Sequence, residues 1–307
     1  MVVIDDIIMN NKESEIYVAL GSFDGLHYGH LSLVKKTVQV AKEKNGKSMV
    51  FTYKNHPKTL VKPESSPKLI MDLETKLKYL EEENIDIVVL KSFNKEFMSM
   101  SAEDFIKLLC LDYNVKGIIV GFNFKFGYKN LGDIELLKNL QDKYGYELYI
   151  MEPYTYNGDV ISSTRIRKIL LEGDVKEATK MLSKPYLIKG KVIHGKKLGR
   201  TIGFPTANLQ FDGKMIIPKK GVYYTNIEYN NKIFKGITSV GNNPTVNGKQ
   251  LTIETFILNF NDTIYGQEIK VYFIERIRDE IKFNSLEELI EQIKQDEKFA
   301  IDKDIVV

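Results

Sequence analysis

The chain has 307 residues, of which 43% are hydrophobic and 28% are charged. This length is enough for two domains with a core each, and the composition is ordinary for a soluble globular protein. The net charge of +3 is mildly basic, and the Lys and Glu residues are interspersed rather than clustered. No basic stripe with interleaved aromatic residues occurs, so the sequence predicts no nucleic-acid partner.

The first residues, "MVVIDDIIMNNKESE", carry early acids and lack the apolar core of a signal peptide. The longest apolar runs are far shorter than the ~20 residues that a bilayer span needs. A single cysteine, Cys110, lies inside the apolar helical run "AEDFIKLLCLDY" and is predicted to be a small core residue. We therefore expect a cytoplasmic protein without membrane association.

Short apolar runs alternate with amphipathic segments from residue 1 to about 184. This pattern predicts a Rossmann-like parallel sheet that helices cover on both faces. Ligands of such sheets bind beyond the carboxyl ends of the strands. The expected strands are 16–20, 48–53, 85–90, 117–121 and 146–151, and the expected helices are 30–44, 72–83, 101–112 and 132–144, with a further helix after "ISSTRIR".

Pro185 marks a predicted boundary between two domains, 1–184 and 185–307. Beyond it, runs rich in Val, Ile, Thr, Tyr and Phe are separated by turn sequences, which predicts a small antiparallel barrel. The final segment, "SLEELIEQIKQDEKFAID", predicts an amphipathic helix that packs on this barrel. Its Ser285 and Glu288 have the spacing of a capping box.

The segment "GSFDGLHYGH" follows the first expected strand of this sheet. Gly21 and Gly25 allow a tight turn and a close approach to a ligand. His27 and His30, three residues apart at a helix start, can both donate hydrogen bonds to a phosphate. A zinc pair and a purely structural pair are the alternatives, although a third metal ligand is not apparent nearby.

The segment "ISSTRIR" places Ser and Thr before an apolar helix with Arg in its first turn. This arrangement is typical of a phosphate-binding helix start. An N-cap beside a surface arginine is the alternative interpretation.

A third segment, "GKKLGRTIGFPTANL", combines glycines with cations, which suits phosphate binding. Thr206 and Asn208 are two residues apart, so on a strand they point the same way and can share one Mg²⁺. The alternative is a turn into a strand without a metal. The candidate phosphate-binding residues here are Gly195, Lys196, Gly199, Arg200 and Gly203.

These motifs resemble those of a known family. "GSFDGLHYGH", "FTYKNHP", "VGFNFKFG" and "ISSTRIR" resemble, in this order, the adenylyltransferase half of the bacterial bifunctional riboflavin kinase/FMN adenylyltransferases (FAD synthetases). "GKVIHGKKLGRTIGFPTANL", "GVYYTNI", "SVGNNPTV", "IETFILNFNDTIYG" and "RIRDEIKF" resemble their riboflavin kinase half. The resemblance spans essentially the whole chain.

The resemblance implies two reactions. The C-terminal domain would phosphorylate riboflavin with Mg-ATP, and the N-terminal domain would join the resulting FMN to the adenylyl group of ATP. Riboflavin, FMN and ATP would be the substrates, and Mg²⁺ the cofactor. The sequence predicts no particular oligomeric state.

The resemblance also assigns roles to residues. His27 and His30 would stabilise the ATP phosphates, and Glu254 would be the general base of the kinase, a task suited to a carboxylate. The first phosphate loop would be shaped by Gly21, Phe23, Asp24 and Gly29. The β- and γ-phosphates would be held by Ser163, Thr164 and Arg167. The metal ligands would be Thr206 and Asn208. The candidate flavin contacts are His56, Asn123, where many relatives have Asp, and Arg278.

Two other functions remain open at this stage. The first domain could transfer the adenylyl group to another acceptor, such as phosphopantetheine or nicotinate mononucleotide. Alternatively, the chain could be a flavin-sensing regulatory or nucleic-acid-binding protein on an inactive enzyme fold. Intact histidines in the first domain and an intact Glu254 in the second argue against the second alternative.

Overall fold

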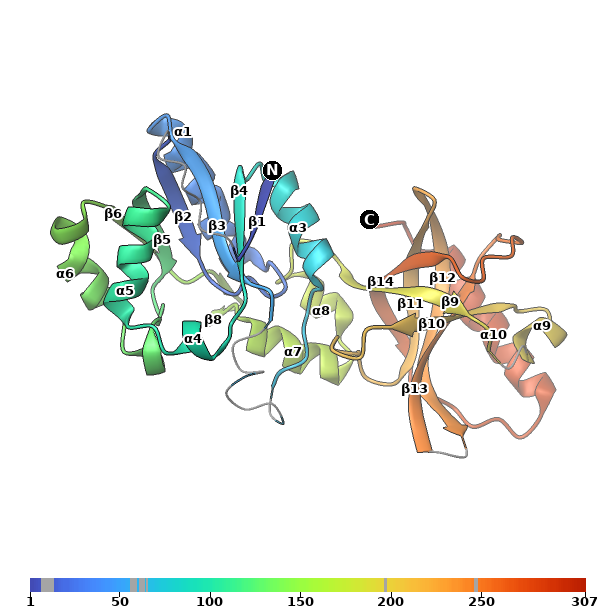
Figure 1. Ribbon diagram of the computed structural model, residues 1–307. Coiled ribbons are helices and arrows are strands. Elements are labelled where there is room, and N and C mark those ends of the chain that lie inside the picture. Colours follow the sequence, from blue (N-terminus) through green and yellow to red (C-terminus); the bar gives the residue numbers. More distant parts are fainter. Residues whose placement is uncertain (7–13, 56–59, 61–63, 65, 196–197, 246–247) are drawn as a thin grey trace. The chain divides into compact units, whose positions relative to one another are not determined.

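A computed structural model describes residues 1–6, 14–55, 60, 64, 66–195, 198–245 and 248–307 of the chain. The described residues form two compact units, Met1–Ser162 and Ser163–Val307 (Figure 1). Two predicted site residues, His56 and Lys196, lie outside the described residues.

The first unit contains a six-stranded sheet in the order β1-β4-β3-β2-β5-β6, and every neighbouring pair is parallel. All five expected strands are confirmed. An additional edge strand, β1, was not expected and pairs with β4. The strands are β1 (Val2–Asp5), β2 (Ile16–Leu20), β3 (Lys47–Tyr53), β4 (Ile87–Lys91), β5 (Val115–Gly121) and β6 (Glu147–Met151).

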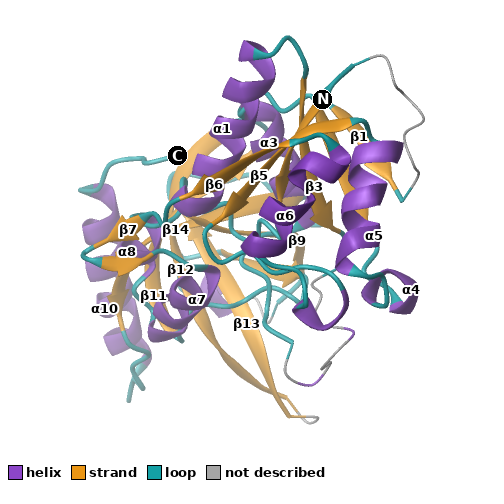
Figure 2. Ribbon diagram, turned by 90° about the vertical axis from the view of Figure 1, so that its left-hand side faces the viewer, coloured by secondary structure: helices purple, strands orange, loops and turns teal. Residues whose placement is uncertain are grey.

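Apolar side chains alternate along β2 between two cores, one on each face of the sheet. Val18 belongs to the core that contains Phe105, and Ala19 belongs to the core that contains Val34. The helices of this unit are α1 (Tyr28–Glu43), α3 (Leu73–Glu82), α4 (Lys95–Met98), α5 (Ala102–Lys107), a π-helical turn (Leu108–Asp112), a 3-10 turn (Tyr128–Asn130) and α6 (Ile134–Tyr144) (Figure 2).

Cys110 lies in the π-helical turn and is buried, so its prediction as a core residue is confirmed. Burial raises the pKa of its thiol to about 11, which keeps the thiol protonated at neutral pH. A short hairpin of β7 (Thr155–Tyr156) and β8 (Asp159–Val160) ends the unit.

The second unit contains a closed antiparallel barrel in the order β10-β13-β12-β11-β14-β9. Its interior includes a chain of three buried hydroxyls, in which Thr238 lies 2.8 Å from Thr225 and 2.9 Å from Thr255. The strands are β9 (Tyr186–Ile193), β10 (Thr206–Phe211), β11 (Gly221–Tyr229), β12 (Lys232–Thr245), β13 (Gly248–Ile257) and β14 (Glu268–Arg278), with a helical turn α9 (Leu198–Thr201).

Two helices that precede Pro185, α7 (Ser163–Glu172) and α8 (Val175–Thr179), also belong to the second unit. The backbone N–H of Lys219 donates to the Leu170 carbonyl at 3.1 Å. The Lys176 ammonium donates to the Glu275 carboxylate of β14 at 3.0 Å. These contacts attach α7 and α8 to the barrel of the second unit.

The expected C-terminal helix is α10 (Leu286–Ile301). Ser285 caps it as predicted, because its hydroxyl accepts from the Glu288 N–H at 3.2 Å. The Glu288 carboxylate in turn accepts from the backbone N–H of Asn284, one residue before the cap. Further along the helix, Asp296 accepts three hydrogen bonds from the Arg278 guanidinium, at 2.7 to 3.1 Å.

Replacing Asp296 by alanine should loosen α10 from the barrel. The Asp296 side chain is 3% exposed and that of Arg278 is 17% exposed, so the variant leaves a largely buried cation without its counter-ion. We expect a local loss of about 3 kcal/mol, which is about 10²-fold faster amide hydrogen exchange in α10 of the full chain. Glu291→Ala, at an exposed position of the same helix, is the matched control. Equal exchange rates in the two variants would contradict this role for the ion pair.

Candidate active sites

The first site begins with the turn after β2. The chain leaves the sheet through three residues in the left-handed region, Phe23 at φ 49°, Gly25 at φ 86° and Leu26 at φ 36°. A Cβ at Gly25 would lie 2.9 Å from Cγ2 of Ile70. Both the backbone conformation and the lack of space therefore require glycine at this position.

His27 and His30 lie at the start of α1, as predicted. His27 is the N-cap residue, and its Nδ1 accepts from the backbone N–H of His30 at 3.3 Å. Because Nδ1 accepts, the neutral ring carries its proton on Nε2. The two rings stack with centroids 3.7 Å apart. Gly29 makes room for this arrangement, since a Cβ there would lie 3.2 Å from the His27 ring.

Phe23 is buried, and it supports the histidine pair from the side. Its ring meets that of His30 edge-on, with centroids 5.3 Å apart. Gly21 allows the ring to lie close to the backbone, because a Cβ there would be 3.2 Å from it. Phe23 and Gly21 therefore pack within the loop, and their role in phosphate binding stays a prediction.

Asp24 points into the protein rather than toward solvent. Its carboxylate is 3% exposed and accepts from the backbone N–H groups of Ile70 at 3.0 Å and Met71 at 3.2 Å. The carbonyl of Ser22 accepts from the Lys76 ammonium at 2.9 Å and from the Thr52 hydroxyl at 3.0 Å. The turn is thus fastened to β3 and α3 by buried polar contacts.

Lys76 is not among the residues that the sequence predicted for this site. A signal was present, because Leu73, Leu77 and Leu80 form an apolar helical face on which Lys76 takes the i+3 position. A lysine there must be buried. The exposed ring of Tyr154 was also missed, and it stacks with Tyr28 beside the histidines, with centroids 5.7 Å apart.

Asn123 lies in the turn after β5 and is exposed. The strand β5 is a parallel neighbour of β2, so this turn reaches the same edge of the sheet as the histidine turn. One hydrogen bond closes this turn, in which the backbone N–H of Phe124 donates to the Gly121 carbonyl at 3.0 Å. The flavin contact of Asn123 stays a prediction.

Ser163, Thr164 and Arg167 occupy the first turn and a half of α7. Thr164 is exposed, and Arg167 follows one turn later on the same side of the helix. Ile166 and Leu170, further along the helix, are fully buried. The three predicted phosphate ligands therefore lie together at the start of this helix, within the second unit.

The second site lies on the outward face of the barrel. Asn208 of β10 is the register partner of Glu254 in β13, so the two side chains stand next to each other on one face. Glu254 is half-buried, whereas Ile253 and Thr255 on either side are fully buried in the interior. Thr206 shares the face of Asn208, since the two residues alternate with buried Ala207.

Gly195 lies directly against the amide of Asn208. A Cβ at Gly195 would lie 2.3 Å from the Asn208 Nδ2 atom. The structure thus brings together Gly195, Thr206 and Asn208 of one predicted motif and Glu254 of another.

The turn between α9 and β10 completes this site. Phe204 donates its N–H to the Gly199 carbonyl at 2.8 Å, and a Cβ at Gly199 would lie 2.2 Å from the Phe204 carbonyl oxygen. Gly203 has φ 87°, a second position that favours glycine. Arg200 is exposed at this turn. Arg278, in contrast, holds α10 through Asp296, and its flavin contact stays a prediction.

The oxygen donors of the second site suit Mg²⁺, which prefers hydroxyl, amide and carboxylate oxygens. Thr206 and Asn208 supply the first two on one strand face. For the histidine pair, the described part of the chain offers no group of three or more His, Cys, Asp or Glu residues that could hold a metal ion.

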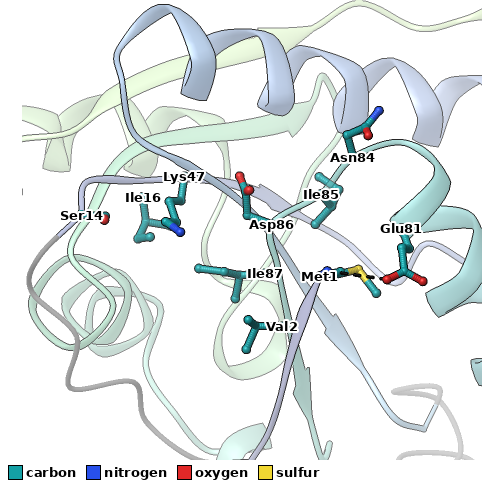
Figure 3. A pocket seen from close by; sticks show the side chains of 10 residues that line it. All are labelled: Met1, Val2, Ser14, Ile16, Lys47, Glu81, Asn84, Ile85, Asp86 and Ile87. Carbon is teal, nitrogen blue, oxygen red and sulfur yellow. Dashed lines mark ion pairs between the residues drawn. The ribbon is translucent and has the colours of Figure 1, made fainter.

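A cavity of about 570 Å³ lies elsewhere in the first unit (Figure 3). Residues around the amino ends of β1 to β4 line it, among them Lys47, Glu81 and Asp86. The histidine turn and Asn123 follow the opposite, carboxyl ends of β2 and β5. Among the described residues, no helix is long and apolar enough to cross a membrane.

Two family models match the chain in turn. Residues 9–165 match FAD synthetase, and residues 182–303 match riboflavin kinase. The Bacillus subtilis bifunctional riboflavin kinase/FMN adenylyltransferase is 37% identical over 96% of this chain and 94% of its own length. The Escherichia coli K12 protein of the same name is 35% identical over 92% of this chain and 91% of its own length.

A solved structure has the same fold. The crystal structure of a Streptococcus pneumoniae protein named a macrolide-efflux protein is 34% identical, covers 99% of this chain and 100% of its own, and superposes with a TM-score of 0.91. Both domain models and the near-complete coverage by curated relatives agree on one family. The chain belongs to the bifunctional riboflavin kinase/FMN adenylyltransferases, with its FAD synthetase domain first and its riboflavin kinase domain second.

Proposed function

We propose that this chain makes FAD from riboflavin in two steps and that each step has its own site. The barrel site transfers a phosphate from Mg-ATP to riboflavin and forms FMN. The site at the sheet edge joins FMN to the adenylyl group of ATP and releases pyrophosphate. The proposal is supported by the arrangement of two motifs, since the histidine pair starts α1 in the first unit and Asn208 stands beside Glu254 in the second. The cytoplasmic location stays a prediction from the sequence.

At the first site, a phosphate oxygen of FMN attacks the α-phosphorus of ATP. The bond from this phosphorus to the bridging oxygen breaks, and pyrophosphate leaves with the electron pair. Negative charge builds up on the phosphate oxygens as this happens. We assign the stabilisation of that charge to His27, His30 and the N-terminal end of the 16-residue helix α1.

At the second site, the 5′-hydroxyl of riboflavin attacks the γ-phosphorus of ATP. Glu254 takes the proton of this hydroxyl, and ADP leaves. Thr206 and Asn208 would hold Mg²⁺ through their side-chain oxygens, and the ion would offset charge on the phosphates. Gly195 and Gly199 let the backbone pack directly against the Asn208 amide and the Phe204 carbonyl of the same site.

One time course tests both steps. Pure protein is incubated with riboflavin, ATP and Mg²⁺, and the flavins are separated by chromatography. We expect FMN to rise first and FAD to appear after it. Untouched riboflavin would refute the kinase assignment. FMN that accumulates without FAD would refute the adenylyl transfer to FMN, and phosphopantetheine and nicotinate mononucleotide would then be tried as acceptors.

Replacing His30 by alanine should reduce FAD formation by about 10²–10³-fold, because one charge-stabilising donor is lost. FMN formation in the same sample is the internal control and should stay at the parental rate. His30→Asn, which keeps a donor, should fall between the parent and the alanine variant. An equal loss of both reactions would contradict the assignment of His30 to one site.

Replacing Glu254 by glutamine should have the opposite pattern. The amide keeps the shape of the side chain but cannot accept the hydroxyl proton, so we expect FMN formation to fall by about 10²–10⁴-fold. Added FMN should still be converted to FAD. If the variant phosphorylates riboflavin at the parental rate, Glu254 is not the base.

Replacing Gly195 by alanine tests the close contact with Asn208. The new methyl group would collide with the Asn208 amide and displace it, so riboflavin phosphorylation should fall and require more Mg²⁺. Gly213→Ala is the matched control, since a Cβ at Gly213 meets nothing within 4 Å. Equal kinase activity and Mg²⁺ dependence in the two variants would show that Asn208 is not a metal ligand.

A further inference from the structure

Lys76 is a buried lysine beneath the histidine turn. It is 7% exposed, on the inner face of α3, and lysine side chains are almost never buried unless they are paired. Its ammonium donates to the carbonyl of Ser22 at 2.9 Å. This carbonyl belongs to the turn rather than to a strand or helix, so the contact links α3 to a segment without regular structure.

The Ser22 carbonyl is held from two elements at once. The hydroxyl of Thr52, in β3, donates to it at 3.0 Å, and Thr52 is fully buried. Two residues further, the Asp24 carboxylate is tied to the backbone at Ile70. Asp24 also exerts an electrostatic attraction on the Lys76 ammonium. The Lys76 ammonium therefore binds a carbonyl of this turn and is attracted by a carboxylate of the same turn.

The position of the Ser22 carbonyl fixes the backbone of the next residue, Phe23. Phe23 has φ 49°, a conformation that a bulky residue adopts only when its surroundings enforce it. Its ring contacts the ring of His30. A shift of the Ser22 carbonyl would therefore move Phe23 and, through it, the histidine pair.

We propose that Lys76 is a positioning residue of the adenylyl-transfer site, whose ammonium, bound to the Ser22 carbonyl beside Asp24, holds the turn so that His27 and His30 face the phosphates. This role deepens the proposed function and rests on it. Lys76 touches neither substrate nor the reacting atoms, and acts through the turn.

The charge of Lys76 makes the role measurable. Burial lowers the pKa of Lys76 to about 8, although the charge of Asp24 opposes this change. Above about pH 8 the ammonium loses its proton, and the Asp24 carboxylate loses its counter-charge. FAD formation should therefore fall as the pH rises through about 8, whereas the riboflavin kinase reaction, which does not use this turn, should not follow the same titration.

Unfolding does not account for such a fall. The pKa of Lys76 is lower in the folded chain than its usual 10.5, so between about pH 8 and 10.5 the unfolded chain binds more protons at this group. The contribution of Lys76 to folding stability therefore increases with pH in this range. Activity and stability should change in opposite directions.

The experiment compares Lys76→Met with Lys78→Met in the full chain. Lys78 lies on the same helix, is 55% exposed and has its ammonium 4.0 Å from the Glu82 carboxylate, so it is the matched control. The rate of FAD formation from FMN and ATP is measured from pH 6.5 to 9.5, with riboflavin phosphorylation in the same samples. We expect Lys76→Met to lower kcat for FAD formation at pH 7 by about 10²-fold, as for a small misplacement of catalytic groups. The fall in the rate of FAD formation above about pH 8 should be absent from this variant.

A parental rate and pH profile in Lys76→Met would overturn the proposal, as would an equal loss of both reactions. If Lys76→Met does not fold, Lys76→Arg decides, because a guanidinium keeps its charge up to pH 9.5. Its FAD formation should stay level above pH 8, and a parental alkaline fall would overturn the proposal. A parental chain that makes no FAD at all would instead refute the proposed function.

Discussion

In a sheet of parallel strands, all carboxyl ends lie at one edge, and this constraint locates the chemistry of the first unit. All five residues of β2 are buried, so the strand itself carries no group that a ligand can reach. Polar side chains appear only after the strand ends. The turns after β2 and β5 are neighbours because these strands pair directly, and this pairing places Asn123 at the same edge as the histidines.

In the barrel, functional side chains reach the surface because residues alternate in direction along each strand, and not because they follow the end of a strand. Successive residues of β13 point inward and outward, so Glu254 faces out between two residues that fill the interior. Its register partner Asn208 supplies the neighbouring group. Glycine has a different task in each site. Gly25 provides a backbone conformation, whereas Gly195 provides space for a side chain from another strand.

The sequence predicted the elements of this fold well. A long apolar or amphipathic pattern is carried by many residues, so no single contact decides whether it is recognised. The sequence predicted less where one contact decides the outcome. The edge strand β1 is short and mostly exposed, so it has no apolar period. Glu288 has the spacing of a capping box, but spacing alone could not show that its carboxylate reaches Asn284.

The candidate sites show the same difference between patterns within one segment, which the sequence reveals, and contacts between distant segments, which it does not. Motifs identified the histidine pair and the kinase strand, since those residues are close in sequence or belong to known signatures. Lys76 and Thr52 come from segments far from the turn they hold, and only the fold brings them to the Ser22 carbonyl. Arg278 was chosen from its motif, and its partner Asp296 lies 18 residues further along the chain.

The membership of α7 and α8 in the barrel unit has a consequence for any attempt to divide this chain. Val175 and Ala178 are fully buried, and α8 packs on β14. A fragment that starts at 185 would strip these helices from the barrel and expose apolar surface on β14. A fragment that ends at 184 would carry the same helices without the surface that covers them. Each half would then tend to aggregate, whereas a cut before Ser163 keeps α7 and α8 with the barrel that covers them.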